Sequence, residues 1–345
     1  AVGAVLDSIS VTNASINTSI TEATNYIGTL LSYGTGVTIT NCTGSGILRG
    51  GSGGGLAGHT GGHSVVEHCS ANCEVYSNQA GGLVGNVGTS AVIKNSNSEG
   101  TSHGTSYTGG LIGFFRGDSL INSYSTATVV AENDHSGGLV GYLYSGAHLV
   151  DCYTNASVQG DNYVGGLIGY LDSDALIEEC YSEGTVEGNT YVGGLIGSCI
   201  NNATIMNCYS HASAAASSSC AGGLIGDIAF ISIYNSYSTG NVSGSAHYGG
   251  LIGSSFNGTT ENCFWDKETS AISFSDGGEG KTTAEMKNVA TFTDESTVGL
   301  TTAWDFLKNP NDDINFNDHW NITTGINNGY PYFSADYLAR VITST

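Results

Sequence analysis

Two short clusters have side-chain types that could carry out chemistry. The tetrapeptide Gly117-Asp118-Ser119-Leu120 has the form of a hydrolase nucleophile segment, but the period of the chain places it in the same turn as residues 171–174. A second cluster offers the ligand types of a zinc site: His59, His63, His68, Glu67 and Cys69. Glycines flank His59 and His63, and the His-Glu-x-x-His sequence of a metallopeptidase helix does not occur in the chain. We therefore expect turn residues and solvated loop histidines, with neither a catalytic serine nor a bound metal.

Carboxylates gather between residues 161 and 179. Polysaccharide-cleaving β-helix enzymes need acidic residues from neighbouring coils in one cluster, and the densest acidic group here is Asp161, Asp172, Asp174, Glu178 and Glu179. The next period has Asn189 and Asn201 where Asp161 and Asp172 stood, so no acidic column repeats. We expect solvated turn acids, no catalytic residue and no cofactor, with weak Ca²⁺ binding as the lesser alternative.

The element that must position all of these residues is a repeat. The pentapeptide Gly-Gly-Leu-x-Gly recurs at steps of 27 to 29 residues, beginning at Gly54, Gly81, Gly109, Gly137, Gly165, Gly193, Gly222 and Gly249. Such a period indicates a solenoid. Within one period, residues 151–178, short runs rich in β-branched and aromatic residues alternate with polar or glycine-containing breaks, and no helical periodicity is sustained.

These patterns predict an all-β fold, a parallel β-helix (β-solenoid). We expect eight to nine coils of about 28 residues, with three short strands per coil and a length of about 40 Å from the strand spacing. An insertion of two residues in the turn at 173–174 should be tolerated, because turns lie outside the stacked strands.

Stacking turns columns of the sequence into ladders of side chains. The aromatic column is Tyr124, Tyr153, Tyr181, Tyr209, Tyr237 and Phe264. A polar column precedes it, made of Asn95, Asn122, Asp151, Glu179, Asn207, Asn235 and Asn262, in which amides could bond from coil to coil. The leucines of the pentapeptides, such as Leu139, Leu167 and Leu195, form a core column, and the glycines beside them permit tight packing that a Cβ would block.

Cysteine follows the same period. Cys152, Cys180 and Cys208 occupy one column, with Cys42, Cys69 and Cys263 at matching places and Ser123 and Ser236 in two other coils. We favour a buried ladder, because Cys is among the most buried residue types and Ser is nearly isosteric with it. Disulfides between ladder neighbours, or between Cys69 and Cys73 or Cys199 and Cys220, stay open as alternatives. Nine cysteines leave at least one unpaired within the chain.

The repeated unit Tyr-Val-Gly-Gly-Leu-Ile-Gly with Asn-Cys-Tyr-Ser resembles the GLUG-motif repeat of large secreted and surface-attached proteins. These include adhesin-like proteins and the non-catalytic part of some IgA-specific metallopeptidases. The resemblance covers residues 26–266, and residues 264–270, 280–287, 304–306 and 329–332 are similar to the segment that closes such arrays. It implies a surface-associated β-solenoid without a defined molecular activity.

Three regions follow along the chain. Residues 1–25 form an alternating apolar strand segment without a Gly-Gly-Leu unit, which we expect to lie outside the regular coil as a cap or donor strand. Residues 26–266 form the solenoid, and residues 267–345 a C-terminal cap or assembly region. Thr282 and Glu285 predict a capping box for a short helix through about Lys287. The three tryptophans, Trp265, Trp304 and Trp320, are expected to cover the open end of the solenoid.

Composition restricts the partners. The formal charge is −22, Lys and Arg total eight, and none lies between Arg116 and Lys267. Nucleic acid and anionic polysaccharide, which need a basic surface, are therefore poor partners, and we expect no binding of nucleic acid. Neutral glycans remain possible. The chain opens at Ala1 and has no run of 18 apolar residues, so we expect a processed, secreted product at an extracellular surface, without membrane insertion.

Eight Asn-x-Ser/Thr acceptors are candidate N-glycosylation sites, at Asn13, Asn17, Asn41, Asn155, Asn202, Asn241, Asn257 and Asn321. Polar turn residues are the alternative interpretation of the same positions. Taken together, the sequence predicts a non-enzymatic extracellular structural protein, a glycosylated subunit of a surface fibre or an adhesin, which self-associates head to tail. The alternatives are a module that binds neutral glycans and, less favoured, a polysaccharide-acting β-helix enzyme.

Overall fold

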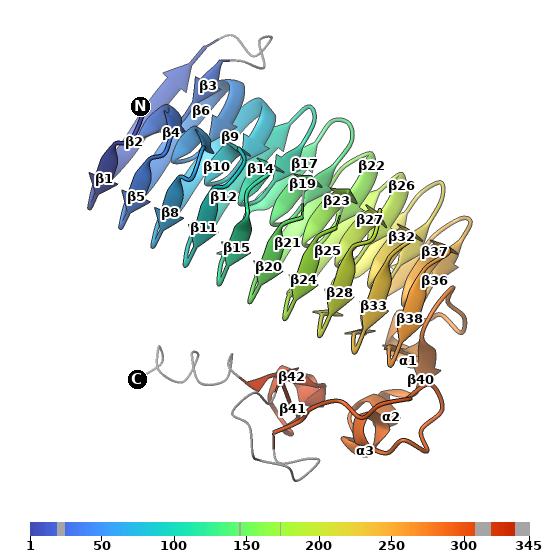
Figure 1. The fold of residues 1–345 in the computed structure, drawn as a ribbon. Helices are drawn as coiled ribbons and strands as arrows, with labels where there is room; N and C mark the ends of the chain where they lie inside the picture. The colour runs from blue at the N-terminus through green and yellow to red at the C-terminus, as the bar shows by residue number, and fades with distance from the viewer. Residues whose placement is uncertain (19–24, 145, 173, 308–318, 335–345) are drawn as a thin grey trace.

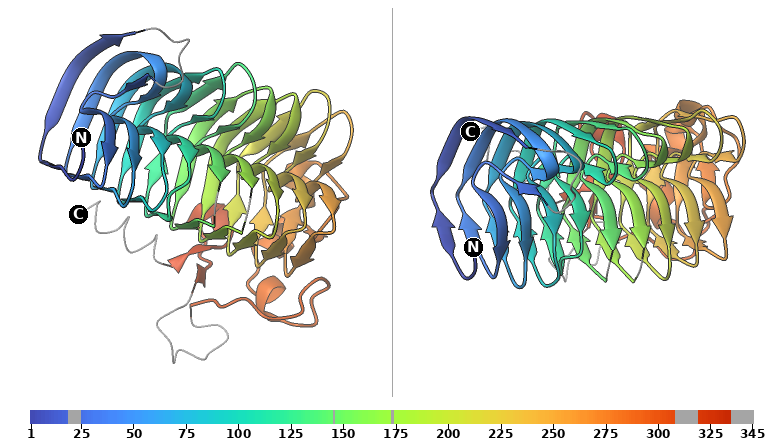
Figure 2. Two further views of the ribbon diagram at one scale, coloured as in Figure 1. Left: turned by 45° about the horizontal axis from the view of Figure 1, so that its top comes forward. Right: turned by 90° about the horizontal axis from the view of Figure 1, so that it is seen from above.

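The computed structural model describes residues 1–18, 25–144, 146–172, 174–307 and 319–334. Within them the chain winds into a parallel β-solenoid of about nine turns, followed by a tail that lies beside it (Figure 1). The predicted fold is confirmed. Strands from successive turns pair in parallel, so that the turns form three long sheets, here named A, B and C (Figure 2). Ser173, one half of the turn expected to accept an insertion, lies outside the described residues.

Sheet A has nine strands in the described structure. They are β4 (Leu31–Thr35), β7 (Ala57–Gly61), β10 (Val84–Val87), β14 (Ile112–Phe115), β19 (Val140–Tyr144), β23 (Ile168–Asp172), β27 (Ile196–Ile200), β32 (Ile225–Ala229) and β37 (Ile252–Phe256). Each begins directly after the Gly-Gly-Leu unit where that unit is present, so the pentapeptide marks the corner between sheets C and A.

Sheet B has ten short strands in the described residues. They are β1 (Val5–Asp7), β5 (Thr38–Thr40), β8 (Val65–Glu67), β11 (Val92–Lys94), β15 (Ser119–Ile121), β20 (His148–Val150), β24 (Leu176–Glu178), β28 (Thr204–Met206), β33 (Ser232–Tyr234) and β38 (Thr259–Glu261). The central residue of each strand points into the core, as with Ile93, Leu149 and Ile177, which are fully buried.

Sheet C is divided in most turns into two or three pieces by a bend. Its strands are β2 (Ser10–Asn17), β3 (Tyr26–Ile27), β6 (Thr43–Gly54), β9 (Ser70–Gly81), β12 (Asn97–Gly104), β13 (Thr108–Gly109), β16 (Tyr124–Ser125), β17 (Thr128–Ala131), β18 (Ser136–Gly137), β21 (Tyr153–Gln159), β22 (Asn162–Gly165), β25 (Tyr181–Gly188), β26 (Thr190–Gly193), β29 (Tyr209–Ser210), β30 (Ser213–Ala216), β31 (Ala221–Gly222), β34 (Tyr237–Ser238), β35 (Val242–Ser243), β36 (Tyr248–Gly249), β39 (Phe264–Asp266) and β40 (Glu279–Lys281).

The glycines are explained by backbone contacts at the corner between sheets C and A. A Cβ on Gly165 would lie 1.9 Å from the carbonyl oxygen of Ile168, and one on Gly166 would lie 2.0 Å from that of Gly194 in the next turn. Both distances are far inside van der Waals contact, so only glycine fits. Leu167 follows, fully buried, and its amide donates to the carbonyl of Leu195 at 2.8 Å. Leu139, Leu167 and Leu195 thus lie in one core column.

The N-terminal segment belongs to the solenoid. The expectation that residues 1–25 lie outside the regular coil fails for the described strands, because β1 pairs in parallel with β5 and β2 with β6. A register shift between Val11 and Ala14 interrupts the second pairing. Leu6, Ile9 and Ile16 pack against the core cluster. The alternating apolar residues of this segment therefore belong to the first turn of the solenoid. That turn differs from the others because it lacks the Gly-Gly-Leu corner.

The described tail contains α1 (Lys267–Ser270), α2 (Thr283–Met286), α3 (Ala290–Thr293), β41 (Trp320–Asn321), the 3-10 turn η1 (Asn327–Gly329) and β42 (Tyr332–Phe333). The predicted capping box is confirmed: the Thr282 hydroxyl accepts from the Glu285 amide, and the Glu285 carboxylate accepts from the Thr282 amide at 2.7 Å. Residues 271–281 cover the last turn. The Gly250 amide donates to the Phe274 carbonyl at 2.9 Å, and β40 pairs with β39.

We predict that Leu167→Asp destabilises the solenoid by about 3 to 5 kcal/mol, because it places an unpaired carboxylate in a stacked apolar core. Ser157→Asp, which adds the same charge at an exposed position of the same turn, should change stability by less than about 0.5 kcal/mol. Denaturant unfolding followed by circular dichroism checks both. Equal stability of Leu167→Asp and the parent would show that the leucine column is not a core.

Candidate functional site

The aromatic column forms a stacked ladder, here called the tyrosine ladder: Tyr124, Tyr153, Tyr181, Tyr209, Tyr237 and Phe264. Its members pair in register on successive strands of sheet C. Ring centroids of the five tyrosines lie 4.8 to 5.2 Å apart with interplanar angles of 4 to 10°. Because parallel neighbours cover both faces of an interior ring, this ladder presents ring edges outward.

The tail covers the C-terminal part of the tyrosine ladder. Tyr181, Tyr209, Tyr237 and Phe264 are buried in one apolar cluster with tail residues Met286, Phe292, Leu300, Trp304, Phe306, Trp320, Tyr330 and Phe333. The expectation that Trp304 and Trp320 close the end of the solenoid is therefore wrong; they pack on its side, while residues 271–281 and Trp265 cover the end. The stacked rings of the ladder form a continuous apolar strip, and the large side chains of Trp304 and Trp320 cover it.

A buried polar network joins this part of the ladder to the tail. The Tyr237 hydroxyl donates to the Pro331 carbonyl at 2.5 Å, and the Asn327 amide donates to the same carbonyl at 2.7 Å. His211 contacts Thr239 through Nδ1 and Asn327 through Nε2, at 2.5 and 2.9 Å. Burial lowers the pKa of His211 to about 4, so its imidazole is neutral at neutral pH. Each buried polar tip thus has a partner, as a docked surface requires.

The polar column beside the ladder anchors the tail from the other side. Asn95, Asn122, Asp151, Glu179, Asn207, Asn235 and Asn262 all have left-handed φ of 43 to 54°. Asn is favoured in this conformation, which explains the column. One coil-to-coil amide bond is present, from Asn122 to Asn95 at 2.7 Å. Other members hold the tail: Glu179 pairs with His319, and the Asn262 carbonyl accepts from the Trp304 indole at 3.0 Å.

A second aromatic surface lies on sheet A and the corner before it. We call it the aromatic face, and its members are Tyr107, Phe114, His135, Tyr142, Tyr163, Tyr170 and Tyr191. Phe114, Tyr142 and Tyr170 pair in register on β14, β19 and β23. Tyr107, His135, Tyr163 and Tyr191 precede the Gly-Gly of their turns by two residues. Sequence reasoning missed this surface, although that recurring ring before Gly-Gly was a usable signal.

The rings of the aromatic face interlock but do not form one parallel stack. His135, Tyr163 and Tyr191 are stacked at centroid distances of 5.0 and 5.1 Å. Tyr142 and Tyr170 are tilted by 53° to each other, and Tyr170 meets Tyr163 edge-on at 61°. In such contacts the edge of one ring meets the face of another, so the faces are less completely covered than in a parallel stack. All seven side chains are half-buried, so part of each ring remains at the surface.

Burial and neighbouring carboxylates favour the neutral form of the Tyr142, Tyr163, Tyr170 and Tyr191 phenols. Burial, followed by the nearby carboxylate of Asp172, raises the pKa of Tyr170 to about 12. Burial also lowers the pKa of His135, against the opposing charge of Asp134. Arg116 lies over the Phe114 ring at 5.0 Å. The Tyr170 phenol is therefore protonated at neutral pH and can donate a hydrogen bond.

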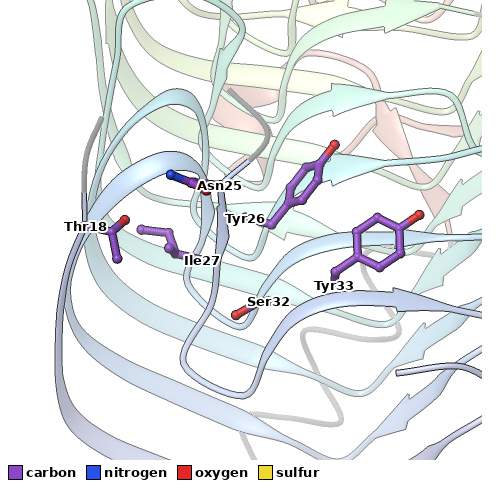
Figure 3. Close-up of a pocket in the computed structure, with 6 residues that line it drawn as sticks. All are labelled: Thr18, Asn25, Tyr26, Ile27, Ser32 and Tyr33. Atoms are coloured by element: carbon purple, nitrogen blue, oxygen red, sulfur yellow. The ribbon is translucent and has the colours of Figure 1, made fainter. Parts of the chain in front are cut away.

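A pocket of about 400 Å³ lies at the N-terminal end of the same sheet A column (Figure 3). It is lined by Thr18, Asn25, Tyr26, Ile27, Ser32 and Tyr33. Both tyrosine hydroxyls point the same way in Figure 3, and the two ring centroids lie 5.5 Å apart. The buried His59 stacks behind Tyr33 at 4.6 Å, and its Nδ1 contacts the Asn86 Oδ1 at 3.0 Å. Uncharged aromatic and polar groups thus line this pocket.

The candidate catalytic residues do not form a working constellation in the described structure. Ser119 begins β15, one rung before His148, and His148 Nε2 lies 3.6 Å from Glu178 Oε2. That separation exceeds a hydrogen bond, and Nε2 is buried without a hydrogen-bond partner. A histidine that activates a serine needs both contacts. Serine, histidine and carboxylate are thus near one another on sheet B without the geometry of a triad.

The candidate metal ligands lie apart from one another, some buried and some exposed. His59 is buried in sheet A, His63 lies in an exposed turn, and His68 lies at the exposed corner beside Glu67. The acidic group is divided as well: Asp172 accepts from the Asn201 amide at 2.6 Å, whereas Glu179 pairs with the tail. Among the described residues no group of three His, Cys, Asp or Glu side chains could hold a metal ion.

The cysteines are buried and unpaired in the described structure: Cys42, Cys69, Cys73, Cys152, Cys180, Cys199, Cys208, Cys220 and Cys263. Cys152, Cys180 and Cys208 lie in one column, and each Sγ donates to a carbonyl two residues before it, at 3.2 to 3.3 Å. Ser123 and Ser236 make the equivalent bond. The position therefore needs a small donor that closes the corner between sheets B and C.

The Asn-x-Ser/Thr acceptors lie on the surface. Asn13, Asn17, Asn41, Asn155, Asn202, Asn241 and Asn257 are exposed, and Asn321 is half-buried in β41. Asn13 and Asn17 both belong to β2, the first strand of sheet C. In the part of the chain that the structure describes, no helix has the length and apolar character needed to span a membrane.

The fold and these ladders define a parallel β-solenoid built from one repeated turn. Residues 160–187 match the family model described as the GLUG motif, and the Gly-Gly-Leu-x-Gly unit of that turn recurs along the solenoid. A solved structure of a candidate immunoglobulin A1 protease from Bacteroides ovatus is similar, with 22% sequence identity and a TM-score of 0.42 over 77% of this chain and 85% of that one. None of the curated proteins compared with the chain matches it.

We predict that none of the nine thiols reacts with Ellman's reagent in the native protein, because all are buried and burial raises the pKa of Cys69 to about 11 and of Cys263 to about 12. In denaturant without reductant all nine should react. Fewer than nine reactive thiols in denaturant would show that disulfides replace part of the ladder.

A second prediction concerns pH. The hydrogen bond with Glu179 raises the pKa of His319 above 6.5, so the contribution of the pair is fully present below pH 6.5 and is lost as pH rises through the raised value. Burial raises the pKa of Glu179, but bonding to His319 and Asp151 outweighs it and leaves the value below 4.5. The contribution is thus largest between about pH 4.5 and 6.5.

His319→Ala should therefore lower the melting temperature by about 1 to 3 °C at pH 6 and by less at pH 9. Fluorescence of the buried Trp304 and Trp320 reports the transition. His63→Ala, in an exposed turn, serves as the control. A melting-temperature loss in His319→Ala that is the same at both pH values would contradict an ionic contact.

Proposed function

We propose that this chain is a non-enzymatic, extracellular structural solenoid, an adhesin-like surface module or the subunit of a surface fibre. The observation that carries the proposal is that the outer surface consists of repeated ladders of side chains, while the serine, histidine and carboxylate that lie near one another on sheet B lack the contacts of a catalytic triad. A ladder repeats the same contact along the molecule. Such a surface suits extended contact with another surface better than turnover of a bound substrate.

An extracellular location is supported by the exposed acceptor asparagines and by the low density of basic residues. Seven of the eight acceptors are accessible in the described structure, as glycosylation requires. The long stretch without Lys or Arg disfavours nucleic acid and anionic polysaccharide as partners. Neutral glycans and host or environmental surfaces remain compatible with this surface.

Head-to-tail self-association into a filament is the assembled form of this proposal. Strands β1 and β2 form the edges of sheets B and C at one end, and β37 and β38 form the edges of sheets A and B at the other. Phe256 at the tip of β37 is 61% exposed. Val2, 85% exposed, bridges Thr35 at the start of the same sheet A column, so a second copy stacked in register would place Val2 against Phe256.

One feature of the C-terminal end opposes this stacking. Strand β40 pairs with β39 and so occupies the rung of sheet C that β2 of a second copy would take. Asp7 and Glu261, which end the first and last strands of sheet B, would also become neighbours of like charge. Assembly in register therefore requires β40 to separate from β39. Pairing with a second copy and pairing with the chain's own β40 exclude each other.

The assembly prediction is that the full chain forms head-to-tail oligomers at high protein concentration. Val2→Lys and Phe256→Asp, at opposite ends, should each weaken association about tenfold, because a charge is placed on an apolar contact. Val298→Asp alters an exposed valine of the tail and should have no effect. Sedimentation and electron microscopy give the readout. A monomer at every concentration, or oligomers indifferent to both end variants, would reject the filament.

A further inference from the structure

We propose that the aromatic face binds a linear, uncharged polysaccharide of extended β-1,4 linkage, laid along the axis of the solenoid. The inference rests on the proposed adhesive role and names its ligand class. Its site is the outer surface of β14, β19 and β23 together with the rings that precede the Gly-Gly corners. The tyrosine ladder does not offer such a site over its C-terminal part, because the tail buries Tyr181, Tyr209, Tyr237 and Phe264.

The first step is the availability of ring faces. Sugars contact aromatic side chains through C–H groups that approach the electron-rich face of the ring. Tyr181, Tyr209 and Tyr237 of the tyrosine ladder offer no face, because neighbours stack on them and the tail covers their edges. Tyr142 and Tyr170 are half-buried and lie at 53° to each other. His135 stacks against one face of Tyr142 at 22°, whereas the ring neighbours of Tyr170 in the described structure are tilted or edge-on, so Tyr170 has no parallel neighbour there.

The second step is spacing. Equivalent residues of successive turns are separated by the strand spacing, about 4.8 Å. Ring centroids in the aromatic face follow it, at 5.2 Å from Phe114 to Tyr142 and 5.3 Å from Tyr142 to Tyr170. This interval is close to the length of one pyranose unit in an extended β-1,4 chain. Successive sugar units of a β-1,4 chain can therefore contact rings of successive turns. An α-1,4 chain is coiled, so its sugar units do not follow the spacing of the turns.

The third step is hydrogen bonding at the rim. Asp172 ends β23, and its carboxylate accepts from the Asn201 amide at 2.6 Å, which holds both polar groups beside Tyr170. Tyr144 ends β19 and is 47% exposed. Phenol, amide and carboxylate groups are those that bind sugar hydroxyls. Arg116 contacts this face through the Phe114 ring. One cation cannot neutralise the repeated negative charges of an anionic polysaccharide, so an uncharged chain is the better ligand.

The fourth observation is backbone conformation. His135, Tyr163 and Tyr191 have φ of 62, 56 and 53°, in the left-handed region that tyrosine rarely adopts. Such a conformation is strained for a residue with a Cβ. It recurs with a ring in three successive turns, where glycine or asparagine would relieve it. The chain thus accepts strain at the positions that set Tyr163 and His135 against Tyr170.

The test uses the full chain and isothermal titration calorimetry with four hexasaccharides. Cellohexaose and mannohexaose are uncharged β-1,4 chains, maltohexaose is α-1,4, and a hyaluronan hexamer is anionic. Tyr142→Ile and Tyr170→Ile remove rings while a good strand former remains. Tyr124→Ile removes a half-buried ring from the uncovered end of the tyrosine ladder and is the matched control. Melting temperatures verify that all three variants fold.

We expect binding of at least one β-1,4 hexasaccharide, weakened about tenfold or more by Tyr142→Ile and by Tyr170→Ile and changed less than about twofold by Tyr124→Ile. No binding of either β-1,4 hexasaccharide, equal weakening by Tyr124→Ile, or a preference for maltohexaose or hyaluronan would overturn the glycan site. Chromatography of the sugars after incubation separates the two proposals, because shortened products would overturn the non-enzymatic function whatever the affinity.

Discussion

The close approach of backbone to backbone at the Gly-Gly corner is the constraint on which the rest of the solenoid depends. At Gly165 and Gly166 the chain turns from sheet C to sheet A so closely that neither position has room for a Cβ. The next residue, Leu167, is thereby directed into the core, and its backbone bonds to Leu195 of the next turn. Since the same corner recurs in each regular turn, it fixes the register of all three sheets.

Once the register is fixed, every outward position becomes a column, and the residue type decides what that column does. Parallel tyrosines stack, with each pair contributing about 0.5 to 1.5 kcal/mol beyond its burial. Asparagines in the left-handed conformation close the corner between sheets B and C and meet the tail. Cysteine and serine both occur in one buried column because, in each turn, either side chain can donate to the carbonyl two residues before it. Function in such a molecule resides in columns instead of a single cleft.

The two aromatic columns differ because of the tail. Trp304, Trp320 and Phe333 contact the tyrosine ladder from Phe264 back to Tyr181. That surface is therefore buried by the contact between the tail and the solenoid. The aromatic face lies around the corner, on sheet A, and its rings remain half-exposed. The same stacking interaction thus stabilises one side of the solenoid and leaves a surface for contact on the other. The adhesive proposal rests on this division between the two aromatic surfaces. The assembly proposal depends on the C-terminal end, where β40 covers β39 in sheet C.

The sequence by itself determined the turn and its repetition: the pentapeptide period predicts the solenoid, its coil length, the leucine core and the members of the tyrosine ladder, because strict stacking converts sequence spacing directly into spatial neighbours. It also located the capping box at Thr282. It did not reveal the aromatic face, since Tyr163 and Tyr170 are seven residues apart in one turn and meet only when the corner folds. Nor did it place Trp320, which reaches Tyr209 across more than a hundred residues. Contacts between columns and between the tail and the coil depend on how separate surfaces are brought together, and only the tertiary structure decides that.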